Sequence, residues 1–196
     1  CITLTWYEIN TQKNKRGWRR RKRKMSRTIL INLVRFIVLV FLQVFLLKNV
    51  TLYNLSTPYL YIMFILLLPF ETPNVLLFAL AFLIGITIDA FYDTPGLHAA
   101  SCVLLAFVRI LFISITVQKD GFDNEPEPTL CNMGIRWFFT YALILTLFHH
   151  FFLFNLEVFR LSEVSYTLSR FVLSSIFTVF LMLLTGFLFY RRKERT

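Results

Sequence analysis

Charged residues are scarce in this chain. They make up 16% of its 196 residues, whereas 57% are apolar and 17% are aromatic. Too little polar surface remains to coat a soluble globule, so the composition predicts a membrane protein. At about 20 apolar residues for each crossing, the length allows several spans but no sizeable soluble catalytic domain beside them. The composition therefore excludes most large enzyme folds.

Cysteine and catalytic motifs are also rare or missing. Cys1, Cys102 and Cys131 form neither a Cys-x-x-Cys metal pair nor a disulfide framework. The sequence contains no Gly-rich phosphate loop, no nucleophile motif and no His-Glu-x-x-His helix. We therefore expect no catalytic residue, no metal and no cofactor, and we expect that the protein is not an enzyme.

Positive charge is concentrated at the N-terminus. Residues 1–24 hold nine of the 21 Lys and Arg residues and one of the 11 acidic residues, so the remainder is nearly neutral. The apolar sequence begins after Met25, and we expect residues 1–24 to be a misassigned start or a disordered extension; a clipped fragment or a genuine tail are the alternatives. Such a basic block is typical of a cytoplasmic anchor on anionic lipid, which we favour over nucleic-acid binding.

Six apolar segments in residues 25–196 predict one membrane domain. They are Thr28 to Leu47, Pro58 to Phe70, Asn74 to Tyr92, Leu97 to Val117, Ile135 to Phe154 and Leu168 to Tyr190. The second would give about 20 Å of helix, too short for a bilayer core of about 30 Å, so it must borrow flanking residues or sit shallow. With Thr72 as a cap and Pro73 as the first helical residue, it is expected to form a tight hairpin with the third segment. The sequence Asp93-Thr94-Pro95-Gly96 predicts a turn to the fourth segment.

Basic residues near the segment ends set the orientation. The N-terminal block, Lys119, Arg136 and the C-terminal tail fall on one side, while Lys48, Arg160 and, at a segment end, Arg170 fall on the other. The excess of Lys and Arg in cytoplasmic loops then predicts that both termini are cytoplasmic. The predicted fold class is an all-α bundle of six transmembrane helices. The acidic stretch from Gln118 to Gly134 is expected to be a linker or a partner contact.

Ionisable residues inside a span cost about 2.5 to 3.5 kcal/mol at its centre, so each one needs a partner or a purpose. Arg35 and Arg109 fall in the cytoplasmic halves of the first and fourth segments. Arg35 can extend its side chain to the interface. For Arg109, a contact with a partner helix or with a carbonyl inside the bundle stands against a side chain that reaches the inner phosphates.

A second polar group lies near the outer end of the third segment. Gly85, Asp89 and Asp93 follow at intervals of four residues, so they are expected to share one helix face and to allow close packing. Asp89 either makes an organised internal hydrogen bond, with His98 as the nearer partner, or is a hydrated helix end. A direct bridge to Arg109 is not expected, since the two differ in depth by about 10 Å.

Two adjacent histidines, His149 and His150, lie near the outer end of the fifth segment. Neighbouring residues on a helix point about 100° apart, which disfavours chelation by one helix. A composite metal site with the outer carboxylates is an alternative, but we expect interfacial histidines. Aromatic residues bracket this segment and are expected to be interfacial anchors and packing residues. They are Trp137, Phe138, Phe139, Phe151, Phe152 and Phe154.

Three stretches carry a resemblance to a known family. They are Phe-Leu-Gln-Val-Phe-Leu-Leu-Lys-Asn from Phe41, Pro-Tyr-Leu-Tyr-Ile-Met-Phe-Ile-Leu-Leu-Leu-Pro from Pro58, and the Gly85, Asp89, Gly96 pattern followed by Arg109. From Met25 to its basic tail, the chain resembles the rod shape-determining protein MreD family, in particular Bacteroidetes-type members. Gly85, Asp89, Asp93, Gly96, His98 and Arg109 are the structural or partner-interface candidates.

The resemblance implies a noncatalytic subunit of the cell-elongation complex in the bacterial inner membrane. Such a subunit binds MreC and works with RodA, a class B penicillin-binding protein and, indirectly, MreB filaments. It supports cell shape and lateral peptidoglycan synthesis. The family's fold is similar to that of the six-helix substrate-binding subunits of energy-coupling-factor transporters, so binding of a small molecule is the alternative function. A ligand binder should keep a polar pocket, whereas an interaction subunit should fill that space.

Overall fold

The structure is a computed structural model that describes residues 26–50, 57–117, 127–157 and 164–188, which form helices and turns without a strand. The chain divides into two units, residues 1–37 and 38–196, and each is described by itself. Five of the described helices are long and apolar enough to cross a membrane. They are Ser26–Asn49, Asn74–Tyr92, Leu97–Thr116, Ile135–Glu157 and Thr167–Leu188. This composition indicates a multi-pass membrane protein.

The described part of the first unit is helical from Ser26 onward. Its apolar side chains are largely exposed, with Ile29 at 63% and Leu30 at 61%. Exposure of this kind suits a helix surrounded by lipid tails, which are as apolar as the side chains themselves. Arg35 donates a hydrogen bond from Nη1 to Oδ1 of Asn32 over 3.4 Å.

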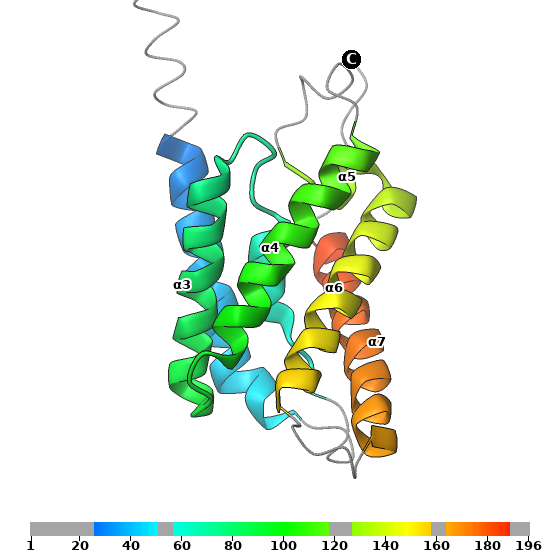
Figure 1. The fold of residues 1–196 in the computed structure, drawn as a ribbon. Coiled ribbons are helices and arrows are strands. Elements are labelled where there is room, and N and C mark those ends of the chain that lie inside the picture. The colour runs from blue at the N-terminus through cyan, green and yellow to red at the C-terminus, as the bar shows by residue number, and fades with distance from the viewer. Residues whose placement is uncertain (1–25, 51–56, 118–126, 158–163, 189–196) are drawn as a thin grey trace, which may run out of the picture. The chain divides into compact units, whose positions relative to one another are not determined.

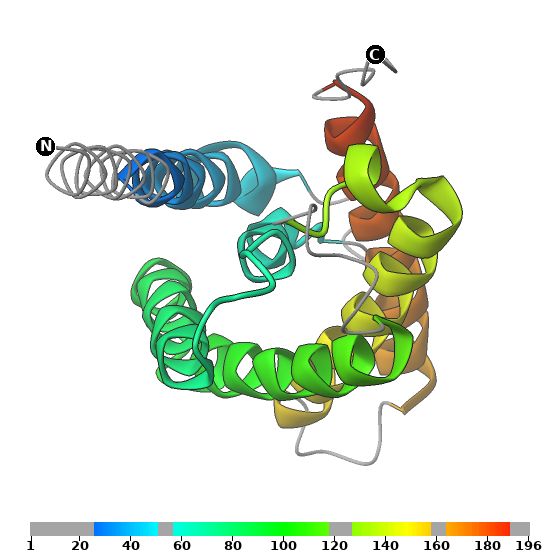
Figure 2. The ribbon, with the colours of Figure 1, turned by 90° about the horizontal axis from the view of Figure 1, so that it is seen from above.

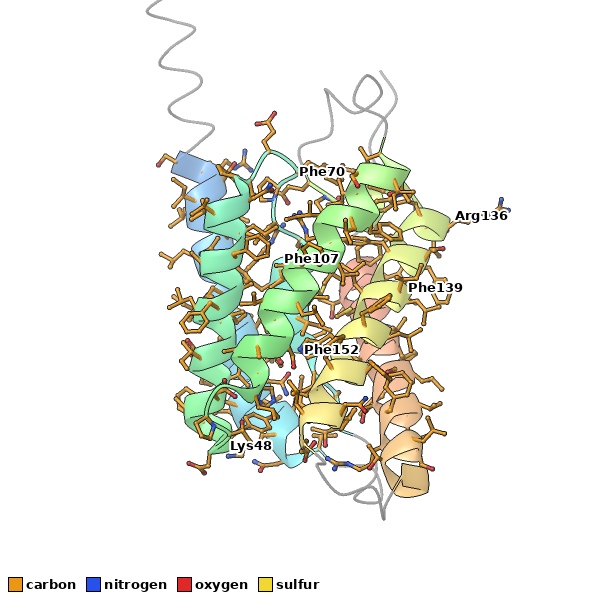
Figure 3. The ribbon with its side chains drawn as sticks, viewed as in Figure 1. Lys48, Phe70, Phe107, Arg136, Phe139 and Phe152 are labelled. Carbon is orange, nitrogen blue, oxygen red and sulfur yellow. The ribbon has the colours of Figure 1, made fainter. Side chains whose placement is uncertain are left out.

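The second unit is built around four helices that pack in chain order. These are α3 (Asn74–Tyr92), α4 (Leu97–Thr116), α6 (Ile135–Glu157) and α7 (Val164–Leu188). α3 packs on α4, α4 on α6, and α6 on α7, as Figures 1 and 2 show. Large apolar side chains remain exposed on these helices, among them Phe107, Phe139 and Phe152 (Figure 3). The third predicted segment matches α3 at both ends, and the fourth matches α4 to within one residue.

The predicted turn between α3 and α4 is confirmed. α3 ends at Tyr92, and the next residue, Asp93, adopts a left-handed conformation with φ of 56°. Gly96 precedes α4 and has φ of 86°, a conformation that residues with a Cβ rarely adopt. The chain therefore reverses direction over four residues, and the first and last of them, Asp93 and Gly96, are left-handed.

The second apolar segment differs from its prediction. It is helical only in η3 (Leu60–Ile62) and α2 (Met63–Leu66). The tight helical hairpin is also wrong, because residues 67–73 between α2 and α3 are not helical. Thr72 is not the cap, since its Oγ1 donates to the carbonyl of Pro69 over 2.8 Å, and Pro73 is the N-cap of α3 and not its first residue. We call residues 57–70 the central segment, since Figure 2 shows it running on the inner side of the helix row. Residues 58–68 are all buried, which is the condition under which irregular backbone is tolerated at membrane depth.

Other boundaries shift by a few residues. The helix Ser26–Asn49 ends in a π turn, η1 (Leu42–Leu46), and a 3-10 turn, η2 (Leu47–Asn49). α6 continues three residues beyond the predicted Phe154. The predicted linker contains a short helix, α5 (Leu130–Met133), capped by the Thr129 side chain, which accepts from Asn132 N. Residues 1–24, residues 118–126 of the linker and the basic C-terminal tail lie outside the described residues.

Candidate functional site

Asp89 is buried at the junction of α3 and α4, with 3% of its surface exposed. Its Oδ1 accepts from the backbone N–H of His98 over 2.9 Å and from His98 Nδ1 over 3.0 Å, while Oδ2 accepts from the N–H of Ala99 over 3.0 Å. The Thr94 hydroxyl donates to the same Oδ1 over 3.0 Å. The first N–H groups of a helix have no intrahelical partner, and negative charge is favoured there. Asp89 thus caps α4 from α3, as in the organised hydrogen-bond alternative.

Gly85 lies one turn before Asp89 and brings the two backbones together. A Cβ at this position would lie 2.4 Å from Ala99 Cα and 2.8 Å from both Ala99 N and His98 O. Any side chain would therefore force α3 and α4 apart at the level of the Asp89 cap. The close packing expected from this small residue is confirmed.

Asp93 does not share the face of Gly85 and Asp89. α3 has already ended at Tyr92, so the side chain of Asp93 leaves the turn in another direction and is exposed. The expectation that all three residues share one helix face is wrong for Asp93, because the left-handed conformation at the helix end breaks the interval of four.

Arg109 is buried beside the last residues of the central segment, with 2% of its surface exposed. Its Nη2 donates to the carbonyl of Leu68 and, over 3.4 Å, to that of Pro69. Its Nε donates to the Tyr141 hydroxyl over 3.1 Å, and that hydroxyl donates to the carbonyl of Leu66 over 2.9 Å. Carbonyls at a helix end lack intrahelical partners and favour a cation. Of the alternatives for Arg109, the structure shows the contact with carbonyls inside the bundle.

The first residues of the central segment are held by Gln43 of η1. Gln43 is fully buried, and its Nε2 donates to the carbonyl of Pro58 over 3.0 Å and to the Tyr92 hydroxyl over 2.9 Å. Its Oε1 accepts from the N–H of Tyr61 over 3.4 Å. Gln43 was not among the predicted site residues, although an amide inside an apolar segment was a usable signal.

Two hydroxyl groups of α7 accept hydrogen bonds from the first residues of the central segment. The N–H of Thr57 donates to Ser174 Oγ over 3.1 Å, and the N–H of Tyr59 donates to Thr178 Oγ1 over 3.0 Å. Ser174 and Thr178 are four residues apart, so they lie on one face of α7. Neither residue was predicted to belong to a site, although this spacing of two polar residues in an apolar segment was a usable signal. Side chains thus replace helical partners for several backbone groups of the central segment.

His149 and His150 are both fully buried, so the expectation of interfacial histidines is wrong. His149 Nε2 lies 3.0 Å from the Tyr61 hydroxyl. His150 bonds through Nδ1 to the carbonyl of Thr146 over 2.9 Å and lies through Nε2 3.3 Å from Thr178 Oγ1. Adjacent residues can both be buried here because α6 packs against α4 and α7. In the described part of the chain, no group of three His, Cys, Asp or Glu residues is placed to bind a metal ion.

The aromatic residues of α6 divide between packing and exposure. Phe138 and Phe154 are each 1% exposed, whereas Phe151 is 53% exposed. Trp137 stacks on Tyr141, with ring centroids 4.8 Å apart and planes at 21°. Tyr141, which binds Arg109, is therefore held in place by ring contacts as well as by hydrogen bonds.

The buried charges thus serve backbone groups of the fold. Asp89 binds N–H groups of α4, and Arg109 binds carbonyls of the central segment. Both side chains therefore stabilise backbone groups at helix ends and in irregular segments by hydrogen bonds.

Comparison with known proteins finds no family model, no curated protein and no solved structure that matches this chain.

Proposed function

We propose that the chain is a noncatalytic subunit of a membrane assembly, of the MreD kind, that joins MreC to RodA and a class B penicillin-binding protein in the bacterial inner membrane. The observation that carries this proposal is the central segment, which fills the interior of the second unit with the protein's own side chains. Tyr61, Ile62, Ile65 and Leu66 have no exposed surface. An interaction subunit is expected to be filled in this way.

A ligand-binding subunit makes a different demand on the same polar residues. It needs a polar pocket of several hundred Å³ whose lining groups are free to meet the ligand. Here Asp89, His98 and His149 are all buried, and each has at least one hydrogen bond with another part of the protein. This arrangement favours the interaction subunit over the energy-coupling-factor alternative.

The proposed topology has six crossings. Five are the apolar helices, and the sixth is the central segment, whose first residues bond to Gln43 near Tyr92 and whose last residues lie beside Arg109, before α3 begins. An even number puts both termini on one side, and the distribution of Lys and Arg makes that side cytoplasmic.

Labelling of single cysteines tests this topology. In a background without the native cysteines, Asn124→Cys should react with a membrane-impermeant maleimide only after the cells are opened. The matched control, Asp93→Cys, lies in the exposed turn between α3 and α4 and should react in intact cells. Labelling of Asn124→Cys from outside would contradict the topology.

Depletion and purification test the function itself. Depletion of the protein in the source bacterium should turn rods into round cells. A C-terminal affinity tag should recover MreC from detergent-solubilised membranes, as identified by mass spectrometry, and a tagged unrelated multi-pass protein serves as the control. Normal rods together with co-purified transporter ATPases would contradict the proposal and favour the small-molecule alternative.

A further inference from the structure

All three histidines of the chain lie in one buried group near the start of α4 and the end of α6. The exposed fraction of each is 2% or less. The ring of Tyr61, from the central segment, contacts His98 and His149, with centroids 5.9 Å and 5.8 Å away. The rings of His149 and His150 are 5.4 Å apart. We call these three histidines and Tyr61 the histidine cluster. Ionisable residues inside membrane spans are costly and mark functional sites, so this cluster needs a purpose.

Three further aromatic rings pack against the cluster. Tyr92 contacts His98, Phe154 contacts His150, and Tyr59 contacts both histidines, with centroids 5.3 to 5.9 Å apart. Tyr59 also contacts Phe154, at 6.2 Å. Tyr92 is the last residue of α3, and Phe154 lies three residues before the end of α6. We call Tyr59, Tyr92 and Phe154 the aromatic layer.

A basic side chain from a neighbouring helix lies over Tyr92. Lys48 Nζ, near the end of the helix Ser26–Asn49, is 5.1 Å from the centroid of the Tyr92 ring. The same ammonium group donates to the carbonyl of Phe91, and Figure 3 shows Lys48 at this end of α3. A cation is attracted by the face of an aromatic ring and by carbonyls at a helix end. Lys48 therefore joins its helix to the end of α3.

A second basic side chain makes the same kind of contact between α7 and α6. The guanidinium carbon of Arg170 is 5.0 Å from the centroid of the Phe154 ring, and both terminal nitrogens bond to Glu157 Oε1 over 3.4 Å. The side chains of Arg170 and Glu157 are 20% and 36% exposed, whereas Phe154 is buried. The cations thus lie toward the surface, and the aromatic layer lies between them and the histidines.

We propose that the aromatic layer is a lid over the histidine cluster, held closed by the contacts of Lys48 and Arg170. Exposed ion pairs and cation–π contacts are weak compared with the packing of a buried core. Local opening of a protein begins at its least stable contacts. Separation of these helix ends uncovers the imidazoles from this end of the unit, while the Arg109 end stays packed. The proposal concerns a motion of the second unit and does not depend on the partners proposed above.

Cys102 reports on the opening of this lid. It is fully buried, follows His98 by one turn of α4, and its thiol interacts with the Tyr61 side chain. The parent for the experiment is the full chain with Cys1→Ser and Cys131→Ser, reconstituted in lipid nanodiscs. The rate at which the small reagent methyl methanethiosulfonate modifies Cys102 then measures the opening.

Removal of either cation should speed this reaction. We expect Lys48→Met and Arg170→Met each to raise the modification rate of Cys102 by about two- to fivefold, because exposed contacts of this kind are individually weak. The double variant should show about the product of the two increases. The matched control is Arg136→Met, which removes an exposed cation that points away from the bundle (Figure 3) and should leave the rate unchanged.

A second reporter separates opening of the lid from unfolding of the whole unit. In a background that also carries Cys102→Ser, Ala142→Cys places a thiol at a fully buried position of α6, next to Tyr141, which binds Arg109. The modification rate of this thiol should not respond to Lys48→Met or Arg170→Met. Unchanged rates at Cys102 in both variants would overturn the proposal. Equal increases at the two reporters would also overturn it, because the opening would then be global.

Discussion

Two buried side chains of opposite charge, Asp89 and Arg109, lie near the two ends of the central segment and satisfy opposite kinds of backbone group. Near its first residues, the Asp89 carboxylate accepts hydrogen bonds from N–H groups at the start of α4. Near its last residues, the Arg109 guanidinium donates to carbonyls at positions 68 and 69. A carboxylate satisfies donors and a guanidinium satisfies acceptors, so each charge matches the backbone groups that the fold leaves unpaired.

The two ends also differ in sequence separation. Asp89 and its partner His98 are nine residues apart across one tight turn, whereas Arg109 lies about 40 residues from the carbonyls that it binds. The hydrogen bonds of Asp89 are local in sequence, so the spacing of Asp89 and His98 can predict them. The Arg109 end requires the complete bundle, because its partners become neighbours only after the helices pack. We therefore expect its loss to cost more.

Replacement of Arg109 gives the largest expected effect. Arg109→Met leaves two carbonyls and the Tyr141 hydroxyl without this donor, so the free energy of unfolding should fall by about 3 kcal/mol or more. Denaturant titration in mixed micelles measures the change. Arg136→Met is the control, since Arg136 points away from the bundle (Figure 3) and should have little effect. Equal stability of the two variants would show that Arg109 does not hold the central segment.

Gly85→Ala tests the close approach that the Asp89 cap requires. The added Cβ would meet backbone atoms of Ala99, which cannot move aside as a flexible side chain would. We expect a loss of about 2 to 3 kcal/mol, measured by the same titration. Gly186→Ala is the matched control, because its Cβ would meet only side chains of Leu130 and Phe138 at 3.7 Å. A Gly85 variant as stable as the Gly186 variant would contradict the packing.

Removal of the Asp89 carboxylate tests whether it caps the first N–H groups of α4. Asp89→Ala leaves buried N–H donors unpaired and should cost about 1 to 3 kcal/mol in thermal or denaturant unfolding. Asp89→Asn keeps one acceptor and nearly the same shape, so its loss should be smaller. Asp93→Asn removes the charge of an exposed side chain in the following turn but still tolerates the left-handed conformation there, so it should leave stability nearly unchanged. If Asp89→Ala and Asp89→Asn both match the parent, Asp89 is only a solvated helix end.

The smallest effect is expected from a single hydroxyl. Tyr141→Phe removes the bond to the Leu66 carbonyl and the acceptor for Arg109 Nε but keeps the ring that stacks on Trp137. We expect a loss of about 1 kcal/mol, and Arg109→Met in the Tyr141→Phe background should cost less than in the parent. Strict additivity of the two changes would argue against a shared network.

The sequence predicted the parts of this fold that depend on local pattern. Length and hydropathy located α3 and α4, and the spacing of Gly85, Asp89 and His98 indicated both close packing and a hydrogen-bond partner. The central segment was assigned a helix because its apolar run resembles a short span. Its true conformation depends on side chains of η1, α4 and α7 that satisfy its backbone, and no local pattern encodes those contacts.

The burial of His149 and His150 is a second feature that local sequence pattern does not predict. His149 and His150 point about 100° apart, so both are buried only where the buried face of the helix is wide. Both are buried because α6 has neighbours on several sides, and this depends on helix order rather than on periodicity. The family resemblance and the partners that it implies remain predictions.

The reactivity of Cys102 tests most directly whether the interior is filled by the protein itself. Cys102 is fully buried in α4, and a buried thiol is inert toward bulky reagents. In a variant with Cys1→Ser and Cys131→Ser, we expect no reaction of the folded protein with a water-soluble maleimide and complete reaction after unfolding in detergent. Rapid labelling of Cys102 in the folded protein would reveal an open polar cavity and contradict the account.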